Sequence, residues 1–211
     1  IAFATGLKIA NPKRDVVVVT GDGDATSIGG NHLIHAARRN IDLTVICINN
    51  DIYGMTGGQI SPTSPEGSFA TTAPYGSTDM PFNIAEVAKA AGASYVAKYT
   101  TAQPMQVAQS IKDGLENKGF SFIEVISQCP TYYGRKNKIR TPVEMIHWFK
   151  ENTITLEQSR NMTEDELKGK IITGVYVNKP RKEFITSSEE VIRKHSEIDP
   201  DDNINKAYMS D

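Results

Sequence analysis

Two polar motifs in this chain have the residue types and spacing of a site for a metal ion and a phosphate. Gly21-Asp-Gly-Asp24 follows one run of β-branched residues, and Asn49-Asn50 follows the next. Glycine lets the backbone approach a ligand closely, and backbone amides at the start of a helix favour phosphate. Asp22 would repel phosphate unless a cation lay between them, and Mg²⁺ combines carboxylate and carbonyl oxygens with phosphate oxygens. The sequence therefore predicts a Mg²⁺ site at Asp22, with the Asn50 side chain and the Ile52 carbonyl as further ligands.

The elements that must position these motifs alternate between strand and helix patterns. Four segments rich in β-branched and other apolar residues predict strands, the first of a kind buried on both faces: Asp15–Thr20, Leu43–Ile48, Ser94–Tyr99 and Phe120–Ile126. Helices are expected over Ile28–Arg39, Asn83–Ala91 and Pro104–Glu116, and a loop over Gly21–Asp24. Strands joined by helical crossovers predict an α/β fold with an open, doubly wound, mostly parallel sheet.

The segment from Asp51 to Pro81 fits neither pattern. It is rich in Gly, Ser, Thr and Pro, and it is longer than the ~12–15 residues of ordinary loops in compact domains. It follows the second predicted strand, where open α/β sheets bind ligands. We therefore expect an active-site or interface loop.

Composition excludes several classes of protein. The 211 residues carry 23 Lys and Arg against 25 Asp and Glu, so nothing suggests binding to nucleic acid or to an anionic membrane. The apolar runs are shorter than the ~20 residues of a membrane-spanning helix. Two cysteines exclude a disulfide-rich secreted scaffold. The chain starts on Ile1 within a helical pattern and has no initiating Met, so we expect its natural beginning to be missing.

Charged residues become denser towards the C-terminus. We expect one domain over residues 1–149, which binds the phosphate-bearing ligand, and a charged extension over 150–211, which is either solvated or docked on a partner. A capping box with proline at the first helical position predicts a helix after Thr141. Weaker caps occur at Thr163–Glu166 and Ser187–Glu190, and Ile171–Val177 is a candidate strand.

The paired motifs resemble the fingerprint of thiamine-diphosphate enzymes, because both follow strands with a helix between them. A nicotinamide Rossmann site is excluded, since no G-x-G-x-x-G follows the first strand. Three stretches resemble the beta subunit of 2-oxoacid:ferredoxin oxidoreductases: residues 21–40, 49–59 and 61–65. Gln128-Cys-Pro-Thr-Tyr-Tyr-Gly-Arg135 resembles the 2-oxoglutarate branch of that family. The resemblance runs from Ile1 to about Lys150.

This resemblance implies a role for each site residue. Mg²⁺ would be held by Asp22, Asn50 and the Ile52 carbonyl. The cofactor would be bound by Gly21, Gly23, Asp24, Gly54 and Met55. The substrate pocket would be bordered by Thr56, Gly57, Gly58 and Gln59, and by the Ser61–Thr63 segment. The glutamate that activates the cofactor is expected on a separate alpha subunit, so no catalytic residue is assigned to this chain.

The resemblance also implies the reaction and its partners. A 2-oxoacid is decarboxylated on thiamine, two electrons pass through iron–sulfur clusters to ferredoxin, and the acyl group is transferred to coenzyme A. Cys129, which follows the last predicted strand, would join three upstream cysteines around a 4Fe–4S cluster, whereas Cys47 is expected in the core. Implied partners are the alpha subunit, ferredoxin-like gamma and delta subunits, ferredoxin and coenzyme A, in the cytoplasm and in anaerobic metabolism.

Three alternatives stay open from the residues. Relatives acting on pyruvate, branched-chain 2-oxoacids or indolepyruvate share most of these motifs. A single-chain thiamine-dependent lyase would need a pyrimidine-binding domain in the same chain, which 211 residues do not contain. A catalytically silent scaffold subunit would not need Asp22 and Asn50, and both are present.

Overall fold

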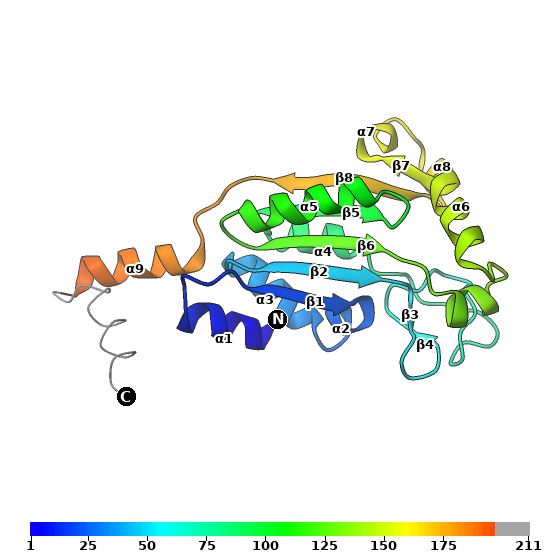
Figure 1. The fold of residues 1–211 in the computed structure, drawn as a ribbon, viewed down its shortest axis with the longest axis horizontal. Helices are drawn as coiled ribbons and strands as arrows, with labels where there is room; N and C mark the ends of the chain where they lie inside the picture. Colours follow the sequence, from blue (N-terminus) through cyan, green and yellow to red (C-terminus); the bar gives the residue numbers. More distant parts are fainter. Residues whose placement is uncertain (197–211) are drawn as a thin grey trace.

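A six-stranded sheet forms the centre of the computed structural model, which describes residues 1–196 (Figure 1). The spatial order is β1-β2-β6-β5-β8-β7. These strands are β1 (Val17–Gly21), β2 (Thr44–Asn49), β5 (Tyr95–Thr100), β6 (Ser121–Ile126), β7 (Thr153–Thr155) and β8 (Ile171–Asn178). β1, β2, β6 and β5 are parallel, β8 runs antiparallel to β5, and β7 is parallel to β8. The predicted open, mostly parallel sheet is confirmed.

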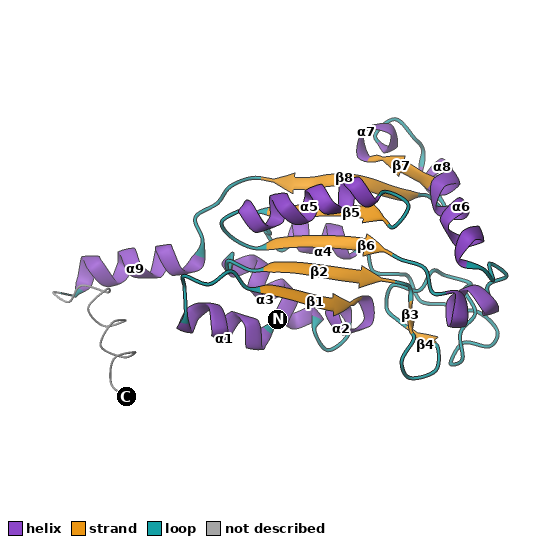
Figure 2. Ribbon diagram, viewed as in Figure 1, coloured by secondary structure: helices purple, strands orange, loops and turns teal. Residues whose placement is uncertain are grey.

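Helices cover both faces of this sheet, so the doubly wound arrangement is also confirmed (Figure 2). α5 (Pro104–Glu116) packs on β5, β6 and β2, where Ile123 and Val125 meet partly buried residues of the helix. α3 (Gly30–Arg39) and α4 (Ile84–Ala90) supply the larger core cluster on the other face, and α1 (Ala2–Ala10) packs beside α3.

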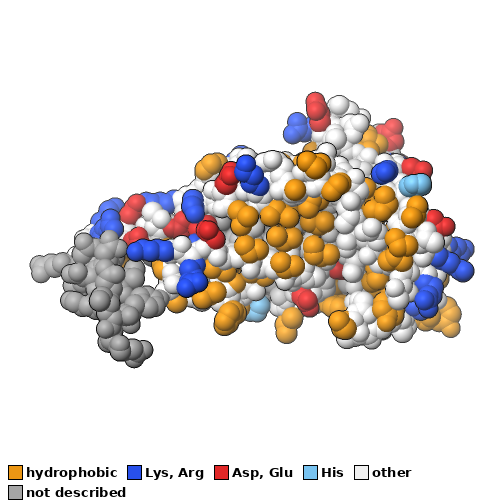
Figure 3. Space-filling view, in the orientation of Figure 1, with side chains coloured by type: hydrophobic (Ala, Val, Ile, Leu, Met, Phe, Trp, Pro, Cys, Tyr) orange, Lys and Arg blue, Asp and Glu red, His pale blue; other side chains and the backbone are white. Residues whose placement is uncertain are grey.

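β1 differs from the prediction that the first strand is buried on both faces. It lies at the edge of the sheet as far as the described residues extend, and Val19 is 70% exposed. The prediction is wrong for a physical reason, because an edge strand has a neighbour on one side only and α5 lies over the central strands instead. Apolar side chains gather on the face of the molecule that carries α5, which is the face turned to the viewer in Figure 3.

Two local predictions are also wrong. Residues predicted as a loop, Gly21–Asp24, instead open the one-turn helix α2 (Asp22–Thr26), whose first turn holds two aspartates that favour the positive end of the helix dipole. The predicted cap at Ser187–Glu190 lies inside α9 (Phe184–His195), which is opened instead by the Glu183 side chain.

The remaining elements follow the sequence patterns more closely. The long segment after Asp51 is mostly loop but contains an antiparallel hairpin of β3 (Ile52–Tyr53) and β4 (Gln59–Ile60). Capping boxes open α6 (Pro142–Asn152), α7 (Leu156–Ser159) and α8 (Glu164–Leu167), and a π-helical turn, η1, covers Pro130–Gly134.

The charged extension is only partly an appendage. Its strand β8 belongs to the main sheet, whereas α9 projects away from it (Figure 1). Residues 197–211 of the predicted extension lie outside the described residues, and docking of the extension on a partner stays a prediction. No helix among residues 1–196 is long and apolar enough to span a membrane.

Candidate active site

The two polar motifs meet at the carboxyl edge of the parallel strands. Gly21 pairs with Ile48 in register, so Asp22 and Asn50 both follow strands that end side by side. The backbone N–H of Asn50 donates to Oδ1 of Asp22 at 3.2 Å. The convergence predicted from the sequence is therefore confirmed.

Asp22 is a buried carboxylate, and its hydrogen-bond donors among the described residues are all neutral. Its side chain is 2% exposed, and its Oδ2 accepts from Ser61 Oγ at 2.7 Å and from Thr63 Oγ1 at 2.6 Å. No basic side chain of the described residues forms an ion pair with it. A buried charge without a counter-charge is costly, so the site favours a cation.

Asn50 could supply a second oxygen for such a cation. Its side-chain Oδ1 is buried and has no hydrogen-bond partner within residues 1–196. A carboxylate accepts about four hydrogen bonds, and Asp22 uses three, so Oδ1 of Asp22 retains acceptor capacity. Carboxylate and amide oxygens suit Mg²⁺, and these residues fit the predicted metal. Ile52 begins β3 just after Asn50, and the role of its carbonyl stays a prediction.

The turn that carries Asn50 is fixed on both sides. Oδ1 of Asn49 accepts from the backbone N–H of Asp51 at 3.0 Å, and the Asp51 carbonyl accepts from Ser64 Oγ at 2.5 Å. Asp51 has a φ of 60°, a left-handed conformation that aspartate and asparagine tolerate better than most residues. Asn50 is therefore held between two residues whose conformations are constrained.

Burial raises the pKa of the Asp51 carboxyl to about 7, and the nearby Asp22 adds to the shift. A carboxyl with a raised pKa in the folded state stabilises the fold below its unfolded pKa of about 4, and this contribution is lost as the pH rises through the folded pKa. We expect metal-free protein to lose stability between about pH 5 and pH 8, and Asp51→Asn to lose less. Thermal unfolding at both pH values measures this, with exposed Asp79→Asn as control, and equal losses in all three proteins would contradict it.

The predicted cofactor residues occupy two neighbouring turns. Gly23 lies under the ring of Tyr53, which a Cβ atom there would overlap, and the Tyr53 hydroxyl donates to the Gly23 carbonyl at 3.1 Å. Gly21 caps α2, and Asp24 is exposed in its first turn. Met55 is 99% exposed. Gly23 is therefore required here by Tyr53, a residue that the sequence analysis did not single out.

The predicted pocket residues form the tip of the β3–β4 hairpin. Thr56 Oγ1 donates to Gln59 Oε1 at 2.6 Å, and Gly57 and Gly58 between them both have positive φ. The ring of Tyr132 packs against Gly58 so closely that a side chain would not fit. Gly54, at the start of the tip, also faces this ring.

The Tyr132 contact brings the loop after β6 to the hairpin. Cys129 lies in this loop, is half-buried and immediately precedes η1. Cys47, the other cysteine, is fully buried in β2, and burial raises the pKa of its thiol, so its predicted place in the core is confirmed. No group of three or more His, Cys, Asp or Glu side chains within the described part of the chain is arranged to hold a metal. A cluster at Cys129 would need further ligands from elsewhere.

The hydrogen bonds of the Ser61–Thr63 segment were not predicted from the sequence. The Ser61 and Thr63 hydroxyls both donate to the Asp22 carboxylate, and the expectation that this segment borders the substrate stays a prediction. The only signal was the run of hydroxyl residues in an otherwise structureless segment, which does not specify its acceptor.

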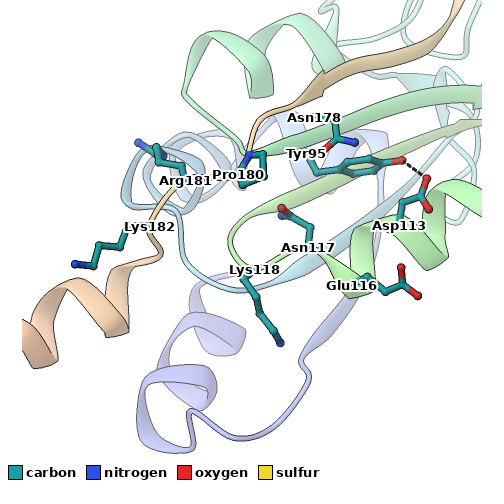
Figure 4. A pocket seen from close by; sticks show the side chains of 9 residues that line it. All are labelled: Tyr95, Asp113, Glu116, Asn117, Lys118, Asn178, Pro180, Arg181 and Lys182. Atoms are coloured by element: carbon teal, nitrogen blue, oxygen red, sulfur yellow. Dashed lines mark hydrogen bonds between the residues drawn. The ribbon is translucent and has the colours of Figure 1, made fainter.

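A separate hollow lies at the opposite, amino end of the sheet (Figure 4). Acidic and basic side chains both line it: Asp113 and Glu116 lie on one side, and Arg181 and Lys182 lie on the other (Figure 4). The Tyr95 hydroxyl donates to Asp113 at 3.5 Å. The mixed charge of the hollow and its distance along the strands from Asp22 separate it from the candidate site.

Sequence and structure comparisons agree with this geometry. The family model "Thiamine pyrophosphate enzyme, C-terminal TPP binding domain" matches residues 1–125. The chain is 66% identical over 184 residues to 2-oxoglutarate synthase subunit KorB of Methanothermobacter thermautotrophicus, covering 87% of this chain and 64% of the relative. It is 61% identical over 212 residues to KorB of Methanothermobacter marburgensis, covering 100% and 73%. The chain is a member of the 2-oxoacid:ferredoxin oxidoreductase beta-subunit family.

Within this beta-subunit family, the similarity is to the 2-oxoglutarate branch. A solved 2-oxoglutarate:ferredoxin oxidoreductase from Magnetococcus marinus, with 2-oxoglutarate, coenzyme A and succinyl-CoA bound, matches with a TM-score of 0.79 at 30% identity. The match covers 98% of this chain and 72% of that one. The predicted family and the thiamine-diphosphate-binding fold are confirmed, and the chain spans about two thirds to three quarters of its relatives' length.

Proposed function

We propose that this chain is the thiamine-diphosphate- and Mg²⁺-binding beta subunit of a 2-oxoglutarate:ferredoxin oxidoreductase. The observation that carries the proposal is the buried Asp22 carboxylate, to which residues 1–196 offer only neutral donors. Beside it, Oδ1 of Asn50 has no hydrogen-bond partner among the same residues. Asp22, Asn50 and the Ile52 carbonyl would hold Mg²⁺, which neutralises the diphosphate. The names of the relatives and the family model support the same conclusion.

The proposed reaction converts 2-oxoglutarate, coenzyme A and two oxidised ferredoxins into succinyl-CoA, carbon dioxide, a proton and two reduced ferredoxins. Bound thiamine diphosphate supplies the electron sink for loss of the carboxylate. This chain would hold the cation and the diphosphate, Gly54 and Met55 would lie along the thiazolium, and the Thr56–Gln59 tip would border the substrate. An alpha subunit would supply the pyrimidine half of the site and the activating glutamate.

Electron transfer and partner binding complete the proposal. Cys129 would be one ligand of a 4Fe–4S cluster on the route to ferredoxin, reached through ferredoxin-like gamma and delta subunits. Arg135 and Arg140 line a hollow beside Pro130, close to Cys129 in the chain. Their charge suits either the phosphates of coenzyme A or the acidic surface of ferredoxin. The proposed location is the cytoplasm.

The substrate assignment is tested on the full-length chain assembled with its alpha subunit. We expect the kcat/KM for 2-oxoglutarate to exceed those for pyruvate and 2-oxoisovalerate by about 100-fold or more, because a site built to bind the second carboxylate leaves charged groups unpaired with the shorter acids. The measurement uses coenzyme A and a viologen dye as electron acceptor. A preference for pyruvate would overturn the substrate but not the reaction class.

A further inference from the structure

Glu124 and Lys98 form a buried ion pair close to the proposed metal site, and neither residue is among the proposed metal ligands. Glu124, in the middle of β6, is 0% exposed, and Lys98 is its register partner on β5. Lys98 Nζ lies 3.5 Å from Glu124 Oε2, an oxygen with no hydrogen bond among the described residues. Because side chains alternate along strands, both residues point to the same face of the sheet as Cys47, the partner of Glu124 on β2.

Asn49 connects this pair to the turn that carries Asn50. Its Nδ2 donates to Glu124 Oε1 at 2.8 Å, and its Oδ1 accepts from the Asp51 backbone N–H at 3.0 Å. A carboxylate only accepts hydrogen bonds, so Glu124 dictates which end of the Asn49 amide faces it. The other end must then present its oxygen to Asp51. The side chain of Asn50 leaves the backbone between these two fixed points.

Folding alone does not require an ion pair at this position. Replacing a buried ion pair by apolar residues of similar size is often neutral or stabilising. The neighbouring residues on β6, Phe122, Ile123 and Val125, are apolar and buried, so an apolar residue would suit the strand. What an apolar residue could not do is accept the hydrogen bond that orients Asn49.

We propose that Glu124, paired with Lys98, is a positioning residue that orients Asn49 and thereby sets the turn from which Asn50 and Ile52 reach Mg²⁺. This rests on the Mg²⁺ site of the proposed function. Glu124 would touch neither metal nor substrate. It would act through the Asn49 amide, and its removal would change metal affinity more than it changes stability.

Two double variants separate positioning from folding. Lys98→Met with Glu124→Leu replaces the pair by apolar residues and removes the acceptor for Asn49. Lys98→Met with Glu124→Gln also removes both charges but retains one carbonyl oxygen, which no lysine contests. We expect the Leu variant to bind Mg²⁺ about 10–100-fold more weakly, as is usual when a group that orients a metal ligand is lost, and the Gln variant to stay within about threefold of the unmodified protein.

The measurement is calorimetric titration of Mg²⁺, with thiamine diphosphate present, into the metal-free full-length chain assembled with its alpha subunit. Thermal unfolding of the same metal-free samples reports stability independently of activity. Lys98→Met alone is the matched control: it leaves Glu124 buried without its cation, so it should lower the melting temperature while the Asn49 bond and the Mg²⁺ affinity are retained.

The outcomes distinguish a failure of the positioning role of Glu124 from a failure of the proposed metal site. Equal affinities for the Leu and Gln variants, while the unmodified protein binds Mg²⁺, would overturn the positioning role of Glu124. An unmodified protein that binds no Mg²⁺ with thiamine diphosphate would instead overturn the proposed metal site. If the Leu variant does not fold, Glu124→Gln alone replaces it. There Lys98 competes with Asn49 for the single carbonyl, so affinity should fall and be restored by adding Lys98→Met.

Discussion

Asp22→Asn should lower the affinity for Mg²⁺ and thiamine diphosphate at least about 100-fold, because it removes the buried negative charge that would bind the cation. Asparagine is the better substitution, since alanine would also leave the buried hydroxyls of Ser61 and Thr63 without their acceptor. Asn retains a side-chain oxygen for these donors, so most of the stability should be kept. Calorimetry of both ligands, binding to the full-length complex, measures the effect.

Asp42→Asn is the matched control for Asp22→Asn. Asp42 is another poorly exposed aspartate, but it forms an ion pair with Lys8 at 2.7 Å, far along the strands from the site. Its substitution should cost stability without changing Mg²⁺ affinity. Undiminished binding by Asp22→Asn, or an equal loss in both variants, would remove Asp22 from the metal site.

Cys129→Ser in the full-length protein should abolish an iron–sulfur cluster while thiamine-diphosphate binding is retained. A 4Fe–4S cluster usually needs four thiolates, and the half-buried Cys129 lies in a loop that Tyr132 packs against the β3–β4 hairpin. We expect iron to fall from about four atoms per chain to almost none, and ferredoxin reduction to fall at least about 100-fold. Anaerobic production, iron analysis and the EPR spectrum of the reduced protein measure this.

Cys47→Ala serves as the comparison for Cys129→Ser. Cys47 is fully buried in β2, so its replacement should change packing and leave iron content unchanged. A full-length protein that contains no iron, or a Cys129→Ser variant with an unchanged EPR signal, would rule out the ligand role.

The sequence by itself determined the parts of this protein that depend on local patterns. The predicted strand Leu43–Ile48 forms as β2 (Thr44–Asn49), because β-branched and apolar residues pack well on both faces of a sheet. The capping box at Thr141 is formed within four residues, so its prediction needed no knowledge of the fold. Asp22 and Asn50 could be placed together because parallel strands end at a common edge.

Only the tertiary structure decided which distant groups meet. Ser61 and Thr63 donate to Asp22 across the long loop, and Glu124 reaches Asn49 from a strand far along the chain. The exposure of Val19 likewise follows from the place of β1 at the edge of the described sheet. Such pairings are set by strand order, by register and by the path of the loop, and a hydroxyl or carboxylate carries no local signal of its partner. The sequence thus identified the residues suited to a metal site, whereas strand order, register and the path of the long loop determined the hydrogen bonds that hold them in place.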